Sequence, residues 1–402
     1  MPHLAAPVRI YRNLAEAVVA ALPEVFDNGR VAERVVDYQF RRNPKWGARD
    51  RAFVADALYE IIRWQRLLTV AAGRADGWSL LGAHLVRRGI ELPPWEELAG
   101  LDAAVVRARL ADDSLPLAVR ESVPDWLAVP PLPEWAARWP AELAAQNGAA
   151  PVTLRVNTLK ATLAEAATRL LAEGIDTDLV PGVPSALRLV QRRALGRSAA
   201  FQSGLVEVQD AGSQLIAPAL RVAPGMHVVD GCAGAGGKTL HLAALLGNVG
   251  KIRALDIGEE RLTELSRRAA RAGALNIRTG LADVATRHQL HGWADRLLLD
   301  VPCSGSGTLR RQPDLKNRLT PEFVGSVNEV QRMILREYPA MLKPGGLVVY
   351  ATCSLLPQEG EAVVRERLNQ PDNDLELLEE HRTWTAESGF DGFYYAVLRK
   401  RG

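Results

Sequence analysis

Cysteine is scarce in this chain. Only three cysteines occur among 402 residues, Cys232, Cys303 and Cys353, and all lie in the second half. A small, odd number of thiols argues against a disulfide framework and predicts a reducing, cytoplasmic location. It also leaves too few thiols for an iron–sulfur cluster or a four-cysteine zinc site. The histidines show no ligand spacing either, so we expect no metal.

Long apolar runs and a strong net charge are also missing. No run of about 18 apolar residues indicates a membrane span, and residues 1–7 lack the apolar core of a signal peptide. The formal net charge is only +2, so any nucleic-acid surface must be a local basic patch. The chain is 48% hydrophobic and long enough for two or three domains, which is typical of packed globular cores.

The first predicted domain, residues 1–130, is helical. Apolar residues recur at every fourth position from Ile10 to Leu22 and again from Phe53 to Ile61, as they do on one face of a helix. Asp50 is positioned to cap the second of these helices. Prolines then concentrate between residues 124 and 140, which indicates a linker.

The second predicted part, residues 131–208, combines that linker with a small α+β module. Its expected elements are a helix at 162–171 and strands at 152–156, 187–190 and 205–208.

The third predicted domain, residues 209–402, alternates strands with helices. The expected strands are 227–230, 252–256, 296–300 and 347–351, and the clearest helices are 239–246 and 259–272. This alternation predicts a parallel, doubly wound sheet with its site at the carboxyl ends of the strands. Asp230, Asp256, Asp300 and Cys353 all fall at such ends.

A glycine-rich turn, Gly231–Thr239, follows the first of these strands. In a phosphate-binding P-loop, Cys232 would have to be glycine, so the nucleotide-hydrolase interpretation fails at its first position. The other interpretation is a dinucleotide-like turn, whose small residues let the backbone approach a ligand. Asp256 could then hold the ribose of an adenosine cofactor such as S-adenosylmethionine. A turn that binds no ligand is the structural alternative.

Two cysteines follow two strands of the same predicted sheet, in Asp300-Val301-Pro302-Cys303 and Thr352-Cys353-Ser354. A cysteine in such a place is more often buried packing than a nucleophile, but one sheet would bring both thiols to one crevice. A thiolate that adds to carbon 6 of cytosine activates carbon 5 toward a methyl donor. A base must then remove the carbon 5 proton, and an acid near ring nitrogen 3 helps the addition. Two cysteines and an aspartate supply those groups.

These motifs resemble those of the Sun-type RNA cytosine-5 methyltransferases, in particular the RsmB-like group that acts on 16S ribosomal RNA. The matching segments are Arg155–Lys160, Gln209–Gln214, Asp230–Thr239, Asp300–Ser304, Arg310–Lys316, Tyr350–Ser354 and Asp391–Ala396. Val301 replaces the family's alanine, Gly234-Ala235 replaces Ala-Pro, and Gly360 replaces the asparagine between two glutamates. None of these departures removes a reactive group. Residues 49–63 resemble the NusB-like helical domain of RsmB-type enzymes.

The resemblance implies an α/β fold: a class I, Rossmann-like S-adenosylmethionine methyltransferase domain, a small α+β module and an N-terminal all-helical, NusB-like RNA-binding domain. It implies that Cys353 is the nucleophile, that Cys303 helps release the methylated base, and that Asp300 contacts both cytosine and cofactor. It assigns Asp256 to the ribose and Asp283 to the adenine. The complete implied cofactor set is Cys232, Ala233, Gly234, Ala235, Gly236, Gly237, Lys238, Asp256, Arg261, Asp283 and Asp300.

Two basic clusters are candidate RNA contacts. The first follows the Cys303 motif and would flank the mouth of the site, although an ordinary solvated loop is the alternative: Arg310, Arg311, Lys316 and Arg318. The second, a weaker indication, surrounds Trp46: Arg41, Arg42, Lys45, Arg49 and Arg51.

The leading hypothesis is therefore methylation of carbon 5 of a cytosine in 16S ribosomal RNA by a monomeric enzyme that binds no membrane. The same reaction on transfer RNA is one alternative. A methyltransferase-like RNA-binding assembly factor without catalysis is another, although retention of both Cys303 and Cys353 argues against it.

Overall fold

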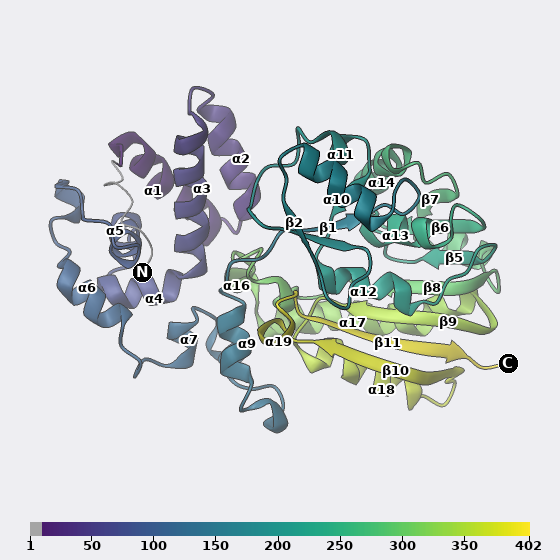
Figure 1. The fold of residues 1–402 in the computed structure, drawn as a ribbon. Coiled ribbons are helices and arrows are strands. Elements are labelled where there is room, and N and C mark those ends of the chain that lie inside the picture. The colour runs from purple at the N-terminus through teal and green to yellow at the C-terminus, as the bar shows by residue number, and fades with distance from the viewer. Residues whose placement is uncertain (1–9) are drawn as a thin grey trace. The chain divides into compact units, whose positions relative to one another are not determined.

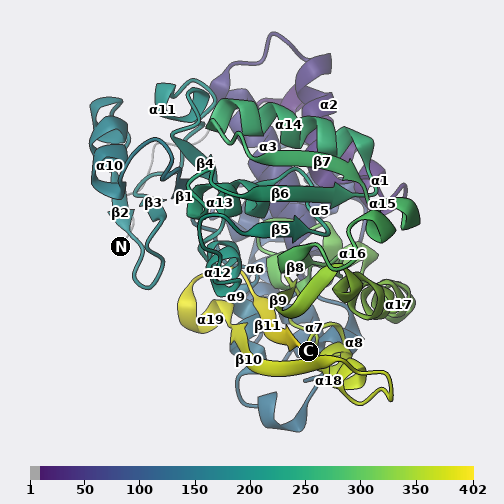
Figure 2. The same ribbon diagram turned by 90° about the vertical axis from the view of Figure 1, so that its right-hand side faces the viewer.

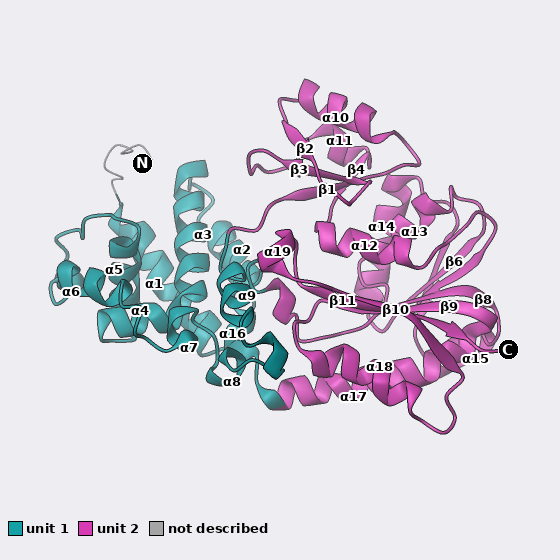
Figure 3. Ribbon diagram, turned by 60° about the horizontal axis from the view of Figure 1, so that its bottom comes forward, with its two compact units in different colours: residues 1–148, 309–321 teal, residues 149–308, 322–402 magenta. Residues whose placement is uncertain are grey.

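The structure is a computed structural model that describes residues 10–402. The chain divides into two compact units (Figure 3). The first runs up to Gly148 and also takes in Leu309–Pro321; the second comprises Ala149–Thr308 and Glu322–Gly402. Within residues 10–402, no helix is both long and apolar enough to cross a membrane. The segment 1–7, where the sequence predicted no signal-peptide core, lies outside the described residues.

The first unit is built from helices throughout its described residues, as the sequence predicted (Figure 1). Its α-helices are α1 (Arg12–Phe26), α2 (Ala32–Arg42), α3 (Ala48–Arg63), α4 (Gln65–Ala72), α5 (Gly77–Arg87), α6 (Ala103–Leu110), α7 (Leu117–Arg120), α8 (Asp125–Ala128), α9 (Trp139–Ala145) and α16 (Leu315–Arg318). The 3-10 turns η1 (Glu96–Leu98) and η2 (Pro133–Trp135) connect some of them.

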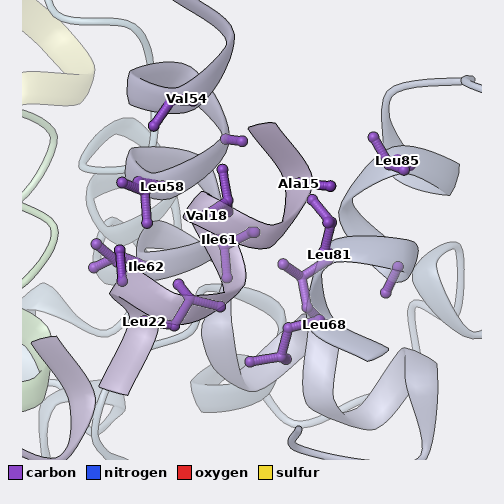
Figure 4. Close-up of a cluster of buried hydrophobic side chains, with 14 of the residues drawn as sticks. Ala15, Val18, Leu22, Val54, Leu58, Ile61, Ile62, Leu68, Leu81 and Leu85 are labelled. Carbon is purple, nitrogen blue, oxygen red and sulfur yellow. The ribbon is translucent and has the colours of Figure 1, made fainter. Parts of the chain in front are cut away.

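The four-residue periodicity of α1 and α3 marks the core of this unit (Figure 4). Leu14, Val18 and Leu22 are buried on α1, and Ala57 and Ile61 face them from α3. Each of the leucine, valine and isoleucine side chains contributes roughly 1.5–3 kcal/mol when it is fully withdrawn from water. The amphipathic pattern therefore accounts for why these helices assemble.

Asp50 does not occupy the capping position that the sequence predicted. Helix α3 begins at Ala48, so the cap is Gly47 and Asp50 is the third residue of the helix. Its carboxylate still accepts a hydrogen bond from the Gly47 backbone N–H at 3.0 Å. The Asp50 side chain thus provides a hydrogen-bond acceptor for the backbone N–H of the capping residue, although Asp50 itself lies within the first turn of the helix.

The second unit contains a seven-stranded sheet in the order β10-β11-β9-β8-β5-β6-β7 (Figure 2). Its strands are β5 (His227–Asp230), β6 (Lys251–Asp256), β7 (Ile277–Leu281), β8 (Ala294–Asp300), β9 (Leu342–Thr352), β10 (Leu375–Thr383) and β11 (Phe393–Lys400). Strands β5 to β9 pair in parallel, but β11 pairs antiparallel with both β9 and β10. The wholly parallel sheet predicted from the sequence is therefore wrong at this edge; the sheet is mixed.

Helices cover both faces of this sheet, which Figures 2 and 3 show. One face carries α12 (Ala211–Ala219), α13 (Gly237–Leu245) and α14 (Glu259–Ala272); the other carries α17 (Pro321–Glu337), η4 (Tyr338–Met341) and α18 (Glu361–Leu368). Neighbouring strand residues alternate between the two cores: Leu298 packs on one face, and Leu297 and Leu299 pack on the other. Burial on both sides explains why these central strands are almost continuously apolar.

A second, four-stranded sheet lies earlier in the same unit. It is antiparallel, in the order β2-β3-β1-β4, from β1 (Thr153–Val156), β2 (Thr177–Leu179), β3 (Ala186–Leu189) and β4 (Val206–Val208). Helix α10 (Leu163–Ala172) packs on it, and Thr162 caps that helix with Glu165 in a reciprocal capping box. The small α+β module predicted from the sequence is thus present.

The predicted domain boundaries at residues 130 and 208 stay predictions. The two compact units divide the chain elsewhere, since α9 and the segment Leu309–Pro321 belong to the helical unit. The chain therefore leaves the second unit directly after the Cys303 loop and re-enters it at the start of α17.

Candidate active site

The loop between β5 and α13 has a backbone shape that depends on glycine. Gly236 has φ +89°, and a Cβ there would lie 2.6 Å from Leu265 Cγ. Gly234 has φ +53°, with open space where its Cβ would be. The loop is tied to the neighbouring strand by a hydrogen bond from Ala233 N–H to the Leu255 carbonyl at 2.8 Å. The glycines thus allow a close turn with an open backbone surface.

Asp230, at the end of β5, is almost fully buried. One carboxylate oxygen accepts a hydrogen bond from the Thr239 hydroxyl at 2.7 Å, whereas Oδ1 is buried without a hydrogen-bond partner. Burial raises the pKa of Asp230 to about 7; the negative charge of Asp300 adds to this, and the Thr239 hydrogen bond opposes it. A buried carboxylate oxygen without a partner is expensive, so this site is suited to a cationic or hydrogen-bonding ligand.

Lys238 and Asp300 form an ion pair next to that loop, with Nζ 2.6 Å from Oδ2. Burial lowers the pKa of Lys238, but the charge of Asp300 and its hydrogen bond outweigh this effect, with further help from Cys353, so the pKa is raised. The ammonium also lies 5.4 Å from the centre of the Phe393 ring. The Lys238 side chain therefore stays positively charged, close to Asp300 at the end of β8 and under the influence of Cys353.

Asp256, at the end of β6, is buried and bonded to the backbone on both sides. Its Oδ2 accepts from Gly234 N–H at 2.9 Å, and its Oδ1 accepts from Gly258 N–H at 2.8 Å. Arg261 lies 3.6 Å from Oδ1 but is mostly exposed. Each carboxylate oxygen has a second lone pair, so Asp256 can accept a further hydrogen bond while it supports the glycine loop.

The structure brings Cys303 and Cys353 together, with their sulfurs 3.2 Å apart. Each follows the end of a strand, and β8 and β9 are neighbours in parallel register, with Asp300 opposite Ala351. Its hydrogen bond with Cys353, together with burial and the charges of Cys353 and Glu359, raises the pKa of the Cys303 thiol well above its usual value. The pair therefore favours a state in which Cys303 keeps its proton.

Two glycines allow this arrangement of the cysteine loops. Gly307 donates its backbone N–H to the Cys353 carbonyl at 3.0 Å, and Gly392 donates to the Gly307 carbonyl at 2.9 Å. A Cβ on Gly307 would lie 2.1 Å from the Gly392 carbonyl oxygen. This close approach gives a structural reason for the Asp391-Gly392 motif at the start of β11.

A hollow of about 280 Å³ opens on the glycine loop. Of the predicted cofactor residues, its lining includes Cys232, Ala233, Gly234, Ala235, Gly237, Lys238 and Asp300. Burial and the surrounding aspartates raise the pKa of the Cys232 thiol well above its usual value, which keeps Cys232 from acting as a nucleophile.

The other predicted cofactor residues lie outside that lining. Gly236 packs against Leu265 and provides the positive φ of the turn. Asp256 lies at the end of β6, and Arg261 lies beside it. Asp283 is exposed and caps α15 (Val284–Gln289) by accepting from Thr286 N–H at 2.7 Å. That hydrogen bond, above all, lowers the pKa of Asp283.

The sequence interpretation assigned no role to several residues of the hollow. These are Val208, Gln209, Ser213, Asp230 and Arg268. Gln209 is held by the buried Arg155, which also donates to the Gly237 carbonyl. Gln209 and Arg155 each lie in a segment that matches a family motif, so the sequence offered a reason to assign them to the site. Arg268 is one of several arginines on the amphipathic helix α14, and nothing in the sequence distinguished it from the others.

The segment Leu309–Pro321, which follows the Cys303 loop, is folded into the helical unit. Arg310 and Lys316 are buried, and Arg311 is half-buried. The Lys316 ammonium donates to the Arg63 carbonyl and the Glu121 carbonyl at 2.9 Å each, and to Asn147 Oδ1 at 2.5 Å. Lys316 is therefore not the exposed phosphate contact that the sequence suggested, because its donors are used within the protein.

The second basic cluster is more exposed. Arg41, Arg42, Lys45 and Arg49 are exposed around the turn from α2 to α3. Arg51 is half-buried and donates to the Trp46 carbonyl at 3.1 Å.

All three cysteines are free thiols. Among residues 10–402, no group of three or more histidine, cysteine or acidic side chains could hold a metal ion.

Two family models match this chain. Residues 217–399 match the 16S rRNA methyltransferase RsmB/F model, and residues 123–195 match the ferredoxin-like domain of RsmF/B-like methyltransferases. The second match covers most of the four-stranded sheet and the helical segment before it.

Named relatives match over a longer stretch. The ribosomal RNA small subunit methyltransferase B of Pasteurella multocida is 36% identical over 69% of this chain and 65% of its own length. The protein of the same name from Pseudomonas putida is 32% identical over 76% of this chain and 74% of its own length.

The crystal structure of a methyltransferase homologue from Pyrococcus horikoshii superposes on 66% of this chain and 92% of its own. Its TM-score is 0.60 at 31% identity. The family model, the relatives and the fold all indicate a methyltransferase, and the methyltransferases of this family are S-adenosylmethionine-dependent. The paired thiols and the glycine loop thus lie in the catalytic domain of an RNA methyltransferase, and the chain belongs to the RsmB/F family of 16S rRNA methyltransferases.

Proposed function

We propose that this protein methylates carbon 5 of a cytosine in 16S ribosomal RNA through a covalent adduct with Cys353. The observation that carries the proposal is the thiol pair, with sulfurs 3.2 Å apart, near the Lys238–Asp300 ion pair. Addition of a thiol to a pyrimidine ring needs a nucleophile, a second proton-handling group and a polar partner for the ring nitrogen. All three are close together here, since the two sulfurs are in contact and the charge of Cys353 acts on Lys238.

The residues around the glycine loop fit S-adenosylmethionine. The partnerless Asp230 Oδ1 and the Asp300 carboxylate suit a cationic amino group, and Asp256 can accept from ribose hydroxyls. The open side of Gly234 leaves room for the ligand against the backbone. When bound, the cofactor supplies an electrophilic methyl group. This chain's own residues act before and after that transfer.

Cys353 acts first. Its sulfur forms a bond to carbon 6, and the electron pair of the ring double bond shifts to carbon 5. The Lys238 ammonium, which donates to Asp300 Oδ2 at 2.6 Å, stabilises the negative charge that develops at ring nitrogen 3. Cys303 keeps its proton at this stage, because its hydrogen bond to Cys353 and the charge of Cys353 both raise its pKa.

Cys303 acts last. Once the Cys353 sulfur is bound to carbon, its charge and its hydrogen bond no longer raise the pKa of Cys303. Cys303 can then release its own proton to solvent, and the resulting thiolate takes the proton from carbon 5. The electron pair of that C–H bond moves between carbons 5 and 6, the bond between carbon 6 and sulfur breaks, and its electron pair returns to Cys353. The ring double bond re-forms and the methylated base leaves.

The RNA substrate can be tested directly. The purified protein should methylate unmodified 16S ribosomal RNA but not transfer RNA, and one cytosine should then resist bisulfite conversion. The same cytosine should become convertible in RNA from a deletion strain. Protection of transfer RNA alone would favour the alternative substrate. Binding of RNA and cofactor without any methylation would favour a non-catalytic assembly factor.

The exposed basic cluster around Trp46 remains our candidate for RNA contact in the helical unit, because its charges are accessible. We also propose that the enzyme acts in the cytoplasm, in keeping with three cysteines that form no disulfide, and that it acts as a monomer.

Asp256→Ala should weaken S-adenosylmethionine binding by about 1.5–3 kcal/mol, the scale of a lost hydrogen bond to a charged group. Calorimetry measures this without RNA. Asp256→Asn keeps one oxygen and should lose less. Glu260→Ala, which removes an exposed acid at the start of α14, serves as the control. Unchanged affinity in Asp256→Ala would show that this acid does not hold the ribose.

A further inference from the structure

Glu359 is a buried carboxylate that contacts both cysteine loops. It ends the 3-10 turn η5 (Pro357–Glu359) and is 0% exposed. Its Oε1 accepts from the Ser304 backbone N–H at 2.7 Å and from Gln331 Nε2 at 3.0 Å. Its Oε2 accepts from the hydroxyls of Ser304 and Ser354, each at 2.5 Å. Four donors thus converge on one side chain.

The two serines are the residues that directly follow the two cysteines. Ser304 follows Cys303, and Ser354 follows Cys353. Ser306 links the two loops a second time, since its hydroxyl lies 3.0 Å from the Ser354 hydroxyl and accepts from Leu355 N–H at 2.9 Å. One carboxylate therefore fixes the chain immediately beyond each thiol.

Glu359 is itself held in place. Its backbone carbonyl accepts from the Tyr350 hydroxyl at 2.7 Å. Gln331 of α17 donates both to Glu359 and to the Pro302 carbonyl, at 2.8 Å, so it braces the residue before Cys303 as well. Only a carboxylate can accept from four donors here, because a glutamine amide would present two N–H donors of its own.

We propose that Glu359 is a positioning residue that sets the distance between the Cys303 and Cys353 thiols, which the reaction requires. The proposal rests on the proposed function for its catalytic meaning, but the distance itself can be tested without RNA. A misplacement of about 1 Å between reacting groups can cost 100-fold in rate. The charge of Glu359 also contributes to the raised pKa of Cys303, after the contributions of Cys353 and burial.

The test compares Glu359→Gln with a matched control, Glu366→Gln. Glu366 lies on α18, pairs with Arg332 of α17 at 2.7 Å and is half-exposed, so the same chemical change occurs away from the cysteine loops. The probe is phenylarsine oxide, which bridges two close thiols: two S–H bonds and the arsenic–oxygen bond break, two As–S bonds form, and the oxygen leaves as water with both protons. Binding should require both Cys303 and Cys353, and single alanine variants check this.

The wild type and Glu366→Gln should bind the arsenical equally, and Glu359→Gln should bind it about tenfold more weakly because the thiols are less well aligned. In methylation, kcat of Glu359→Gln should fall about 100-fold while KM for S-adenosylmethionine stays nearly constant. If Glu359→Gln does not fold, Ser354→Ala, which removes one donor to the carboxylate, should shift both readouts in the same direction.

Unchanged arsenical binding and unchanged kcat in a folded Glu359→Gln protein would overturn the proposal. Weakened arsenical binding combined with a wild type that methylates no RNA would support the positioning role and reject the proposed function instead. The two failures are therefore distinguishable.

Discussion

Cys353→Ala should abolish methyl transfer, lowering kcat by about four orders of magnitude, while affinity for S-adenosylmethionine stays nearly unchanged. The reason is that the thiol lies beyond the end of β9, outside the lining of the hollow on the glycine loop, and two other candidate nucleophiles near that loop keep their protons. Lys238 keeps its proton because its ion pair with Asp300 raises its pKa, and Cys232 keeps its proton because burial and three nearby aspartates raise its pKa.

Single-turnover methylation of RNA with tritiated cofactor measures the loss, and calorimetry checks the cofactor. Cys232→Ala is the comparison, because it also removes a thiol from the active site. It should still turn over at saturating cofactor and differ mainly in KM. Substantial turnover by Cys353→Ala would exclude Cys353 as the nucleophile.

The central strands could be predicted because their burial leaves a strong pattern. Strand β8 is apolar on both faces, so Leu297, Leu298 and Leu299 read as one continuous run. Strand β7 was not predicted, since it lies at the edge of the sheet and most of its residues are partly or fully exposed. Strand β10 forms the opposite edge and was not predicted either. Its glutamates and the bulge between Leu377 and Glu379 interrupt the alternation of apolar and polar residues that marks a strand.

The candidate site was predictable to a similar, limited extent. Short motifs identified the glycine loop, Cys303 and Cys353, because the residues of each motif are consecutive or nearly so in the sequence. The role of Glu359 could not be read in the same way, since its partners come from two other segments. Lys316 was misjudged for a related reason: a lysine in a basic run is usually exposed, and only the fold brings Arg63, Glu121 and Asn147 around it.

Cys303→Ala should trap the enzyme on its RNA. If Cys353 adds to carbon 6 and Cys303 is needed for release, loss of Cys303 alone leaves the adduct formed but unresolved. The remaining thiol, Cys232, is a poor substitute in the release step, because burial and nearby aspartates raise its pKa and keep it protonated. A protein–RNA band that survives denaturing electrophoresis is the expected result, and it should require both cofactor and a cytosine at the target position.

The double variant lacking both Cys303 and Cys353 is the matched control, and it should show no such band. Cys303→Ser tests the chemistry further, because a hydroxyl preserves the size of the side chain but is a much poorer base than a thiolate. It should therefore accumulate the adduct as well. A Cys303→Ala protein that binds RNA and cofactor but forms no adduct would show that the two thiols do not divide the work in this way. Cys303 would then assist the first addition, for example by holding the Cys353 sulfur through their 3.2 Å contact.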